Sequence, residues 1–226
     1  MVDLRARLAR SSDLYFMLYA ASAAFSTYFC MYAFRKPFSA AQYEGFTFLG
    51  TDLELKTALA LSQLLGYTIS KYVGIRICSE RLGERRGQLL VQLIVCAFVA
   101  LLLFGLLPLQ WKWLALLLNG LPLGMVWGLC VSFLEGRRSS DALLAGLSCS
   151  FIVASGVVKD VGRWLMSSWG VSEFWMPAAT GSLFLVPFFL SVWLLIQLPQ
   201  PSAEDISLRC ERTAMDKAAR WAFVRR

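Results

Sequence analysis

The first residues with chemical potential are tyrosines and cations at the end of an apolar run. Tyr28, Tyr32 and Arg35 are spaced i, i+4 and i+7, so a helix would place them on one face. Lys36 and a proline follow directly. If the helix ends at Phe34, the two cations anchor it at the membrane surface. If the helix continues through the proline with a kink, Arg35 and Lys36 lie within the membrane. These residues alone favour neither alternative.

A second polar face runs along residues 56–78. Gln63, Tyr67 and Lys71 recur at every fourth residue, and Lys71 lies about 15 residues, or roughly 22 Å along a helix, beyond Lys56. A cation that faces lipid at this depth costs at least ~2.5–3.5 kcal/mol. Lys71 therefore either snorkels to the inner boundary or faces a polar cavity. Its alignment with Gln63 and Tyr67 favours the cavity.

A third cation, Lys159, lies in the sequence SGVVKDVGRW near the end of a later apolar stretch. Lys159 and Arg163 are spaced i, i+4, and Asp160 can pair with Arg163 at i, i+3. Two interpretations stand: an interfacial ion cluster, which the expected depth of Lys159 favours, and contact with a bound solute.

Cations gathered in one cavity would need an anionic partner. A guanidinium binds phosphate or carboxylate through two parallel hydrogen bonds, and an ammonium adds a point charge. Neutral polar side chains on the same faces would orient the organic part of a solute. The expected substrate-binding residues are Tyr28, Tyr32, Arg35, Lys36, Gln63, Tyr67, Lys71 and Lys159. The expected ligand is a small anionic solute with a phosphate or carboxylate group.

The apolar composition indicates which elements must position these residues. Of 226 residues, 58% are hydrophobic and 16% are charged, whereas a soluble domain has about 45–50% apolar residues. A membrane helix needs about 20 mainly apolar residues. Six segments qualify: 14–34, 56–78, 87–107, 113–134, 142–165 and 174–198. The sequence predicts an all-α integral membrane protein, with a six-helix domain over 1–198 and a tail over 199–226.

The positive charges predict the orientation of these helices. With the N-terminus inside, the cytoplasmic segments hold the arginines of 5–10, 76–86 and 137–138 and six cations of the tail. The outer loops hold Lys56 and Lys112, with Arg35 and Lys36 if those are exposed. Both termini are therefore expected in the cytoplasm, with the chain in the cell inner membrane. Tryptophans mark the expected outer boundary: Trp111, Trp113, Trp169 and Trp175.

The same composition excludes several classes of function. The net charge of +7 follows the loops and tail, so it indicates topology and no nucleic-acid partner. The sequence has no histidine, which removes Ser-His-Asp triads and HExxH zinc sites. Its six cysteines form no CxxC pair, so we expect no metal site or disulfide framework. We expect no enzymatic activity and no cofactor.

Small residues recur at every fourth position in two of the segments. They are Ser62, Gly66, Ser70 and Gly74 in the second and Gly120, Gly124 and Gly128 in the fourth. Such stripes allow two helices to approach closely, so we expect a structural role for them.

The stretches YFCMYAFRKPFSAA and GYTISKYVGIRICSERLGERRG resemble the amino-terminal half of the major facilitator superfamily, most of all its organophosphate:phosphate antiporters. That branch carries Tyr-x3-Tyr-x2-Arg-Lys in its first span and Gly-[Tyr/Phe]-x2-Ser-Lys in its second. The matching residues are Tyr28, Tyr32, Arg35, Lys36, Gly66, Tyr67, Ser70 and Lys71. The resemblance covers residues 14–90 and implies that Arg35, Lys36 and Lys71 face a central cavity and bind phosphate. From residue 135 on, the chain resembles a bacterial family of unknown function within the superfamily. The chain as a whole is most similar to that family, and the antiporters are its distant relatives.

The loop after the second segment resembles the cytoplasmic signature of that superfamily, Gly-x3-Asp-[Arg/Lys]-x-Gly-x-[Arg/Lys]-[Arg/Lys]. The residues that fit are Glu80, Arg81, Gly83, Arg85 and Arg86. Glu80 replaces the Asp, and Arg76 stands where the first Gly belongs. The resemblance implies an inner gate closed by charge pairs. Family members often carry an arginine near the position of Asn119, and its absence leaves proton coupling unsupported.

Transporters of this superfamily have two six-helix halves, each built from two inverted three-helix repeats, with the solute between the halves. The six segments correspond to one half, and residues 199–226 resemble the central linker. Three alternatives follow: a piece of a 12-span chain, a homodimer or a complex with a second half, or a copy without transport activity. The expected function is alternating-access transport of a small anionic solute. The alternative is a non-transporting membrane scaffold, which would use the small-residue stripes as contacts and tolerate neutral replacements of Arg35 and Lys71.

Overall fold

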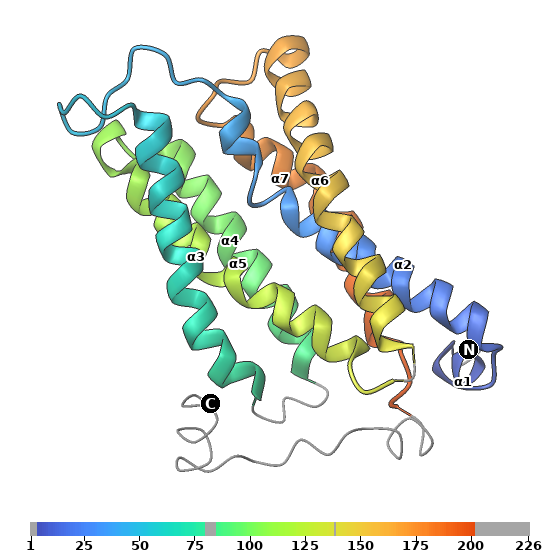
Figure 1. Ribbon diagram of the computed structural model, residues 1–226. Helices are drawn as coiled ribbons and strands as arrows, with labels where there is room; N and C mark the ends of the chain where they lie inside the picture. The colour runs from blue at the N-terminus through green and yellow to red at the C-terminus, as the bar shows by residue number, and fades with distance from the viewer. Residues whose placement is uncertain (1–3, 80–84, 138, 202–226) are drawn as a thin grey trace, which may run out of the picture.

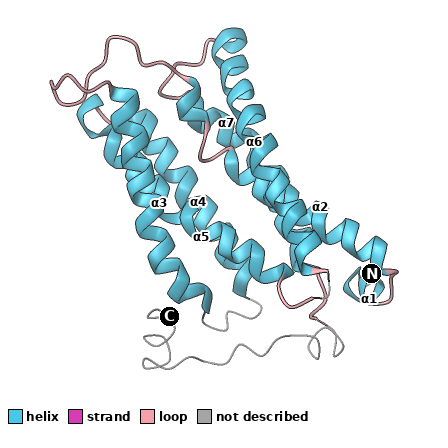
Figure 2. Cartoon of the chain, viewed as in Figure 1, coloured by secondary structure: helices cyan, strands magenta, loops and turns pink. Residues whose placement is uncertain are grey.

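The structure is a computed structural model that describes residues 4–79, 85–137 and 139–201. Within this part, α-helices and short 3₁₀-helices are joined by loops (Figures 1 and 2). In chain order they are α1 (Leu4–Ala9), α2 (Asp13–Tyr32), η1 (Pro37–Ala40), α3 (Leu55–Ser79), α4 (Arg86–Leu106), η3 (Leu109–Trp111), α5 (Lys112–Leu134), α6 (Ser140–Trp169) and α7 (Met176–Ile196). Most of the predicted tail lies outside the described residues, as do Glu80, Arg81 and Gly83.

Each of the six predicted segments forms one long helix. Five stretches of the described chain are long and apolar enough to cross a membrane: α2, α4, Leu109–Leu134, α6 and α7. This is the pattern of a multi-pass membrane protein. The remaining long helix, α3, has the lowest apolarity of the six because Gln63 and Lys71 interrupt its apolar residues.

The first span ends earlier than the kinked alternative requires. α2 stops at Tyr32, and the 3₁₀-helix η1 begins at Pro37, so no continuous helix runs on to residue 45. Proline has no N–H to donate, so no α-type bond can run from residue 37 back to Ala33. Over residues 33–36 the α-helix gives way to a turn in which the amides of Phe34 and Arg35 donate to the carbonyls three residues earlier, and this turn is the unwound end of α2.

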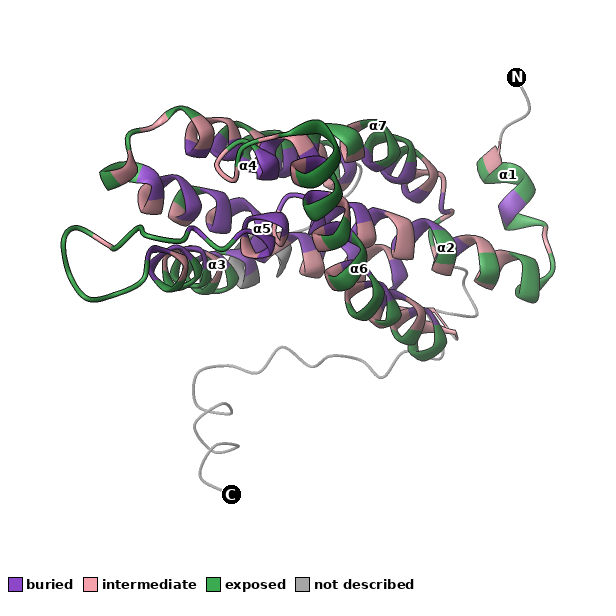
Figure 3. Cartoon of the chain, turned by 90° about the horizontal axis from the view of Figure 1, so that it is seen from above, coloured by how far each residue is buried: buried purple, intermediate pink, exposed green. Residues whose placement is uncertain are grey.

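The long helices form two groups of three. α3 and α4 both pack against α5, α2 packs against α6 and α7, and the groups meet where α4 contacts α7 and α2 contacts α5. Figure 1 shows α3, α4 and α5 on one side and α2, α6 and α7 on the other. Exposed apolar side chains remain on the outer faces of α3 (Leu61, Leu64, Ile69) and α6 (Ile152, Val153) (Figure 3).

The two small-residue stripes face each other between α3 and α5, which confirms their predicted structural role. A Cβ atom at Gly66 would overlap the backbone carbonyl of Leu117, and one at Gly120 would overlap the carbonyl of Gln63. A Cβ atom at Gly124 would lie 2.6 Å from that of Ser70. Glycine at these positions lets the two backbones approach closely.

Lys112 is not a surface residue of an outer loop, as its position between two segments suggested. Its ammonium is buried, donates to the carbonyl of Phe104 at 2.6 Å and lies 4.3 Å from the ring centroid of Phe174. It therefore caps the C-terminal end of α4, where helix carbonyls lack partners.

Candidate anion-binding site

The two predicted polar faces, on α2 and α3, meet at the ring of Tyr67. The guanidinium carbon of Arg35 lies 4.1 Å from the Tyr67 centroid and 5.7 Å from that of Tyr32. The ammonium of Lys71 lies 5.1 Å from the same Tyr67 ring. Tyr28 continues the aromatic surface, with its ring 5.6 Å from that of Tyr32. A tyrosine ring attracts a cation over its face, so these contacts hold the cationic groups of Arg35 and Lys71 at the same ring.

A second residue of α3, Gln63, fixes the backbone at Arg35. The side-chain amide nitrogen of Gln63 donates to the carbonyl oxygen of Arg35 at 3.0 Å and to Oδ1 of Asn119 at 2.8 Å. Gln63 is buried, and its amide nitrogen is engaged with protein groups. Its predicted direct contact with a solute stays a prediction, while its contact with the Arg35 backbone is observed.

Asn119 on α5 connects four segments of the fold. Its Nδ2 donates to the carbonyls of Phe34 at 3.1 Å and Ala97 at 2.9 Å, and its Oδ1 accepts from Gln63. Asn119 is 0% exposed, so a missing partner at any of these atoms would leave a polar group buried without a hydrogen bond. This residue joins α3, α4 and α5 to the unwound end of α2.

Lys36 and Lys159 add positive charge next to Arg35. Lys36 is half-buried and lies beyond the end of the α2 span. Its burial lowers the pKa of its ammonium below the usual 10.5, and the nearby charges of Arg35 and Lys159 lower this pKa further. Lys159 is thus within electrostatic range of the α2 end. α6 extends to Trp169, which places Lys159 ten residues, about 15 Å, from its C-terminal end. Lys159 therefore lies farther from the end of its helix than the predicted segment 142–165 indicated.

Acidic partners do not neutralise these cations in the described ranges. The ion pair found there joins Arg163 to Asp160 at 2.7 Å, as the i, i+3 spacing predicted, and both side chains are exposed. Asp160 is thereby paired within α6. Arg35, Lys36, Lys71 and Lys159 form no ion pair with a described carboxylate.

The predicted gating loop is described only at its end. Arg85 is exposed and precedes α4. The guanidinium of Arg86 donates to the carbonyl of Ser132 at 2.6 Å and lies 5.7 Å from the ring of Phe133. Arg86 therefore links the start of α4 to the last turn of α5.

A family model covers most of the sequence, matching residues 37–226. The chain belongs to DUF5690, a family of unknown function. No curated protein and no solved structure matches it. The region that defines this DUF5690 chain contains Gln63, Tyr67, Lys71 and Lys159, and begins just after Arg35 and Lys36.

Sequence analysis missed two residues that shape this site in the DUF5690 chain. Asn119 holds the α2 end, and the ring of Trp127 packs edge-on against Tyr28 at 5.0 Å. A signal for Asn119 was present, because a lone amide in an apolar membrane helix must find hydrogen-bond partners. Trp127 gave no signal, since an aromatic residue in such a helix is unremarkable.

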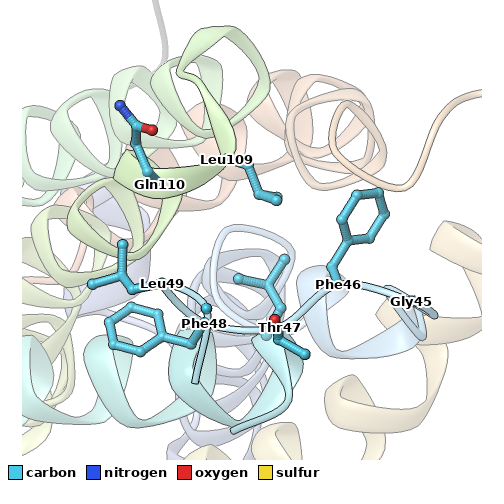
Figure 4. A pocket seen from close by; sticks show the side chains of 9 residues that line it. Gly45, Phe46, Thr47, Phe48, Leu49, Leu109 and Gln110 are labelled. Atoms are coloured by element: carbon cyan, nitrogen blue, oxygen red, sulfur yellow. The ribbon is translucent and has the colours of Figure 1, made fainter. Parts of the chain in front are cut away.

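A separate pocket of about 310 Å³ lies at the end of the bundle that carries the 45–54 loop. Residues 45–50 line one side, and Leu109 and Gln110 line the other (Figure 4). None of the predicted substrate-binding residues contributes to it. The cation cluster and this pocket are therefore distinct features of the structure.

Proposed function

We propose that this chain is one six-helix half of a major facilitator-type secondary transporter, and that it binds a small anionic solute with a phosphate or carboxylate group. The observation that carries the proposal is the Arg35 guanidinium, held over Tyr67 with Lys36, Lys71 and Lys159 nearby and no described carboxylate to pair with it. Lys71 and Lys159 lie within the long helices α3 and α6, and cations inside membrane helices without a described acidic partner indicate an anion pathway.

The geometry of Arg35 suits a planar anion. The guanidinium carbon lies 4.1 Å from the Tyr67 centroid, and a guanidinium carries five N–H donors, more than its contact with Tyr32 can use. Those donors match the spacing of two carboxylate or phosphate oxygens. Lys71, whose ammonium lies 5.1 Å from the same Tyr67 ring, supplies a second positive charge.

The helix contacts support the proposed 3+3 repeats. In such repeats α2 would correspond to α5, α3 to α6 and α4 to α7. The α3–α5 contact then corresponds to the α2–α6 contact, and the α4–α5 contact corresponds to the α2–α7 contact. The same correspondence leaves the α4–α7 and α2–α5 contacts unchanged, whereas the α6–α7 contact has no counterpart of similar extent between α3 and α4. Two three-helix units related by a pseudo-two-fold axis would produce these pairings.

We extend the proposal to six membrane spans with both termini in the cytoplasm of the inner membrane. α3 then crosses as the sixth span, with its polar face toward the cavity in place of lipid. Figure 1 shows α1 and the α5–α6 connection, which carry arginines, at one end of the bundle, and the end of α6 and the start of α7 at the opposite end. Exposed Trp169 and Trp175 belong to these latter segments. This distribution follows the positive-inside rule and the aromatic belt.

Alternating access requires a second six-helix unit that rocks against the first. We propose that a second half or a second copy of this chain supplies it, with the solute between the two. The scaffold alternative relied on the small-residue stripes as contacts with other proteins. Because Gly66 and Gly120 are occupied in the α3–α5 contact, a scaffold would have to use other surfaces.

The experiment that tests the proposal measures anion binding by the full chain in lipid nanodiscs. Isothermal titration with inorganic phosphate and with malonate gives the affinity of wild type, Arg35→Lys and the control Arg163→Lys, whose exposed ion pair lies outside the site. We expect Arg35→Lys to lose about 1.5–3 kcal/mol, at least roughly tenfold in Kd, since it removes the bidentate fork. Equal affinity of Arg35→Lys and wild type for both anions would overturn the assignment.

A further inference from the structure

We infer that Asn119 and Gln63 are positioning residues that hold the unwound end of α2 and thereby fix the side chain of Arg35 over Tyr67. This inference rests on the proposed function for its meaning in solute binding. Whether the side-chain amides of Gln63 and Asn119 fix the position of Arg35 can be measured without any solute.

The unwound end of α2 leaves carbonyl groups without helical donors. The amide of Lys36 donates to the carbonyl of Tyr32 at 2.9 Å, which is the last bond of α type. Pro37 has no N–H, and the amide of Ser39 turns back to the carbonyl of Lys36 at 3.0 Å. The carbonyls of Phe34 and Arg35 instead accept from Asn119 and Gln63. Without such donors a buried carbonyl would be left without a hydrogen bond, which destabilises the fold.

The orientation of both side-chain amides follows from their partners. The carbonyls of Phe34 and Ala97 can only accept, so the group of Asn119 that faces them must be its NH₂. Oδ1 of Asn119 is then an acceptor, and Gln63 must present its own NH₂ to it and to the carbonyl of Arg35. All four amide N–H bonds are used, so neither side chain can rotate without losing hydrogen bonds.

Arg35 is consequently attached to α3 at two points one helical turn apart. Gln63 holds its carbonyl oxygen, and Tyr67, four residues later on the same face, lies under its guanidinium at 4.1 Å. Asn119 fixes the preceding residue, whose buried ring packs 6.2 Å from Phe98 and 6.3 Å from Phe188. A shift of the backbone at Arg35 would therefore move the guanidinium away from the Tyr67 face.

The closing experiment uses the full chain in nanodiscs with Gln63→Met and Asn119→Leu, each alone and combined with Arg35→Lys. The control is Thr180→Val, which removes a fully buried hydroxyl that bonds within its own helix. Helix content by circular dichroism selects the folded variants. Phosphate titration and the rate of Arg35 modification by phenylglyoxal, followed by mass spectrometry, are the two readouts. The exposed Arg163 is the internal reference for the modification rate.

We expect Gln63→Met to weaken phosphate binding about tenfold, because a displaced Arg35 guanidinium would lose one charge-assisted hydrogen bond to the anion. The loss should vanish in the Arg35→Lys background, because the amide acts through Arg35. Modification of Arg35 should accelerate severalfold in Gln63→Met and Asn119→Leu, with no change at Arg163 or in Thr180→Val. A purely structural amide would lower affinity equally in both backgrounds, which would overturn the inference.

Failure of the inference and failure of the proposed function give different results. If wild type binds neither phosphate nor malonate but Arg35 modification still accelerates in the amide variants, positioning holds and the proposed function fails. If wild type binds phosphate through Arg35 while folded Gln63→Met keeps both the affinity and the modification rate of wild type, the proposed function holds and positioning is wrong.

Discussion

The guanidinium carbon of Arg35 lies 4.1 Å from the centre of the Tyr67 ring, across the junction between the end of α2 and the middle of α3. This contact joins two polar faces that are separate in sequence. It also places the ammonium of Lys71, 5.1 Å from the same ring, beside the guanidinium. The expected behaviour of the site follows from this shared aromatic platform.

Loss of the Tyr67 ring should weaken anion binding, whereas loss of only its hydroxyl should reduce the affinity less. We expect Tyr67→Leu to lose about 0.5–2 kcal/mol of phosphate affinity, since a cation–π contact of partly desolvated Arg35 is removed. Tyr67→Phe keeps the ring and should stay closer to wild type.

Tyr72 provides the matched control, because it lies on the same helix and is 75% exposed. Phosphate titration of Tyr67→Leu, Tyr67→Phe and Tyr72→Leu compares the three positions. A loss in Tyr72→Leu as large as that in Tyr67→Leu would show that the aromatic contact is not responsible.

The α3–α5 contact should be sensitive to a single added methyl group. Gly66→Ala would overlap the carbonyl of Leu117, a backbone atom that cannot rotate away. Overpacking of this kind costs about 1–3 kcal/mol, so the midpoint of unfolding in SDS titration should fall.

Gly156→Ala is the corresponding control on α6, since nothing lies within 4 Å of the added atom. Removing glycine from a helix interior stabilises it by roughly 0.5–1 kcal/mol, so this variant should equal or exceed wild type. Gly66→Ala with wild-type stability would contradict the close approach of α3 and α5.

Anion binding should weaken with rising pH before ordinary lysines lose their charge. Burial and the charges of Arg35 and Lys159 lower the pKa of Lys36 from 10.5, so its ammonium is lost at a lower pH than that of an exposed lysine. The positive charge favours the anion only below this lowered pKa. Phosphate affinity should therefore fall on the alkaline side, in a window that ends below 10.5.

Lys36→Arg keeps its charge throughout that window, because arginine does not deprotonate in proteins. We expect its phosphate affinity to stay level where that of wild type declines. Titrations at a series of alkaline pH values, with Lys56→Arg as the control, give the comparison. Parallel decline in wild type and Lys36→Arg would assign the pH dependence to another group.

Helix positions followed from the sequence because apolar length alone specifies a membrane span. All six predicted segments became helices, and the stripes at Gly66 and Gly120 indicated a close contact, since only small residues let backbones meet. The pairing of Asp160 with Arg163 also followed, because i, i+3 neighbours on a helix are local.

Other features depended on neighbours that the sequence does not specify. The end of α2 shows this. Gln63 bonds to the carbonyl of Arg35 from 28 residues away, and Asn119 bonds to the carbonyl of Phe34 from 85 residues away. Lys112 was placed on a loop surface by position, but the C-terminal carbonyls of α4 and the ring of Phe174 bury it.

The sequence by itself determined six long helices, five of them apolar enough to cross a membrane, with their small-residue stripes and two polar faces with cations. These features depend on local spacing and on transfer between water and lipid. Only the tertiary structure decided that the two faces meet at Tyr67, that Lys159 lies near Lys36, and that Asn119 secures the end of α2. The physical reason is that side-chain contacts between helices depend on the rotation and depth of each helix. Packing of the whole bundle sets both quantities.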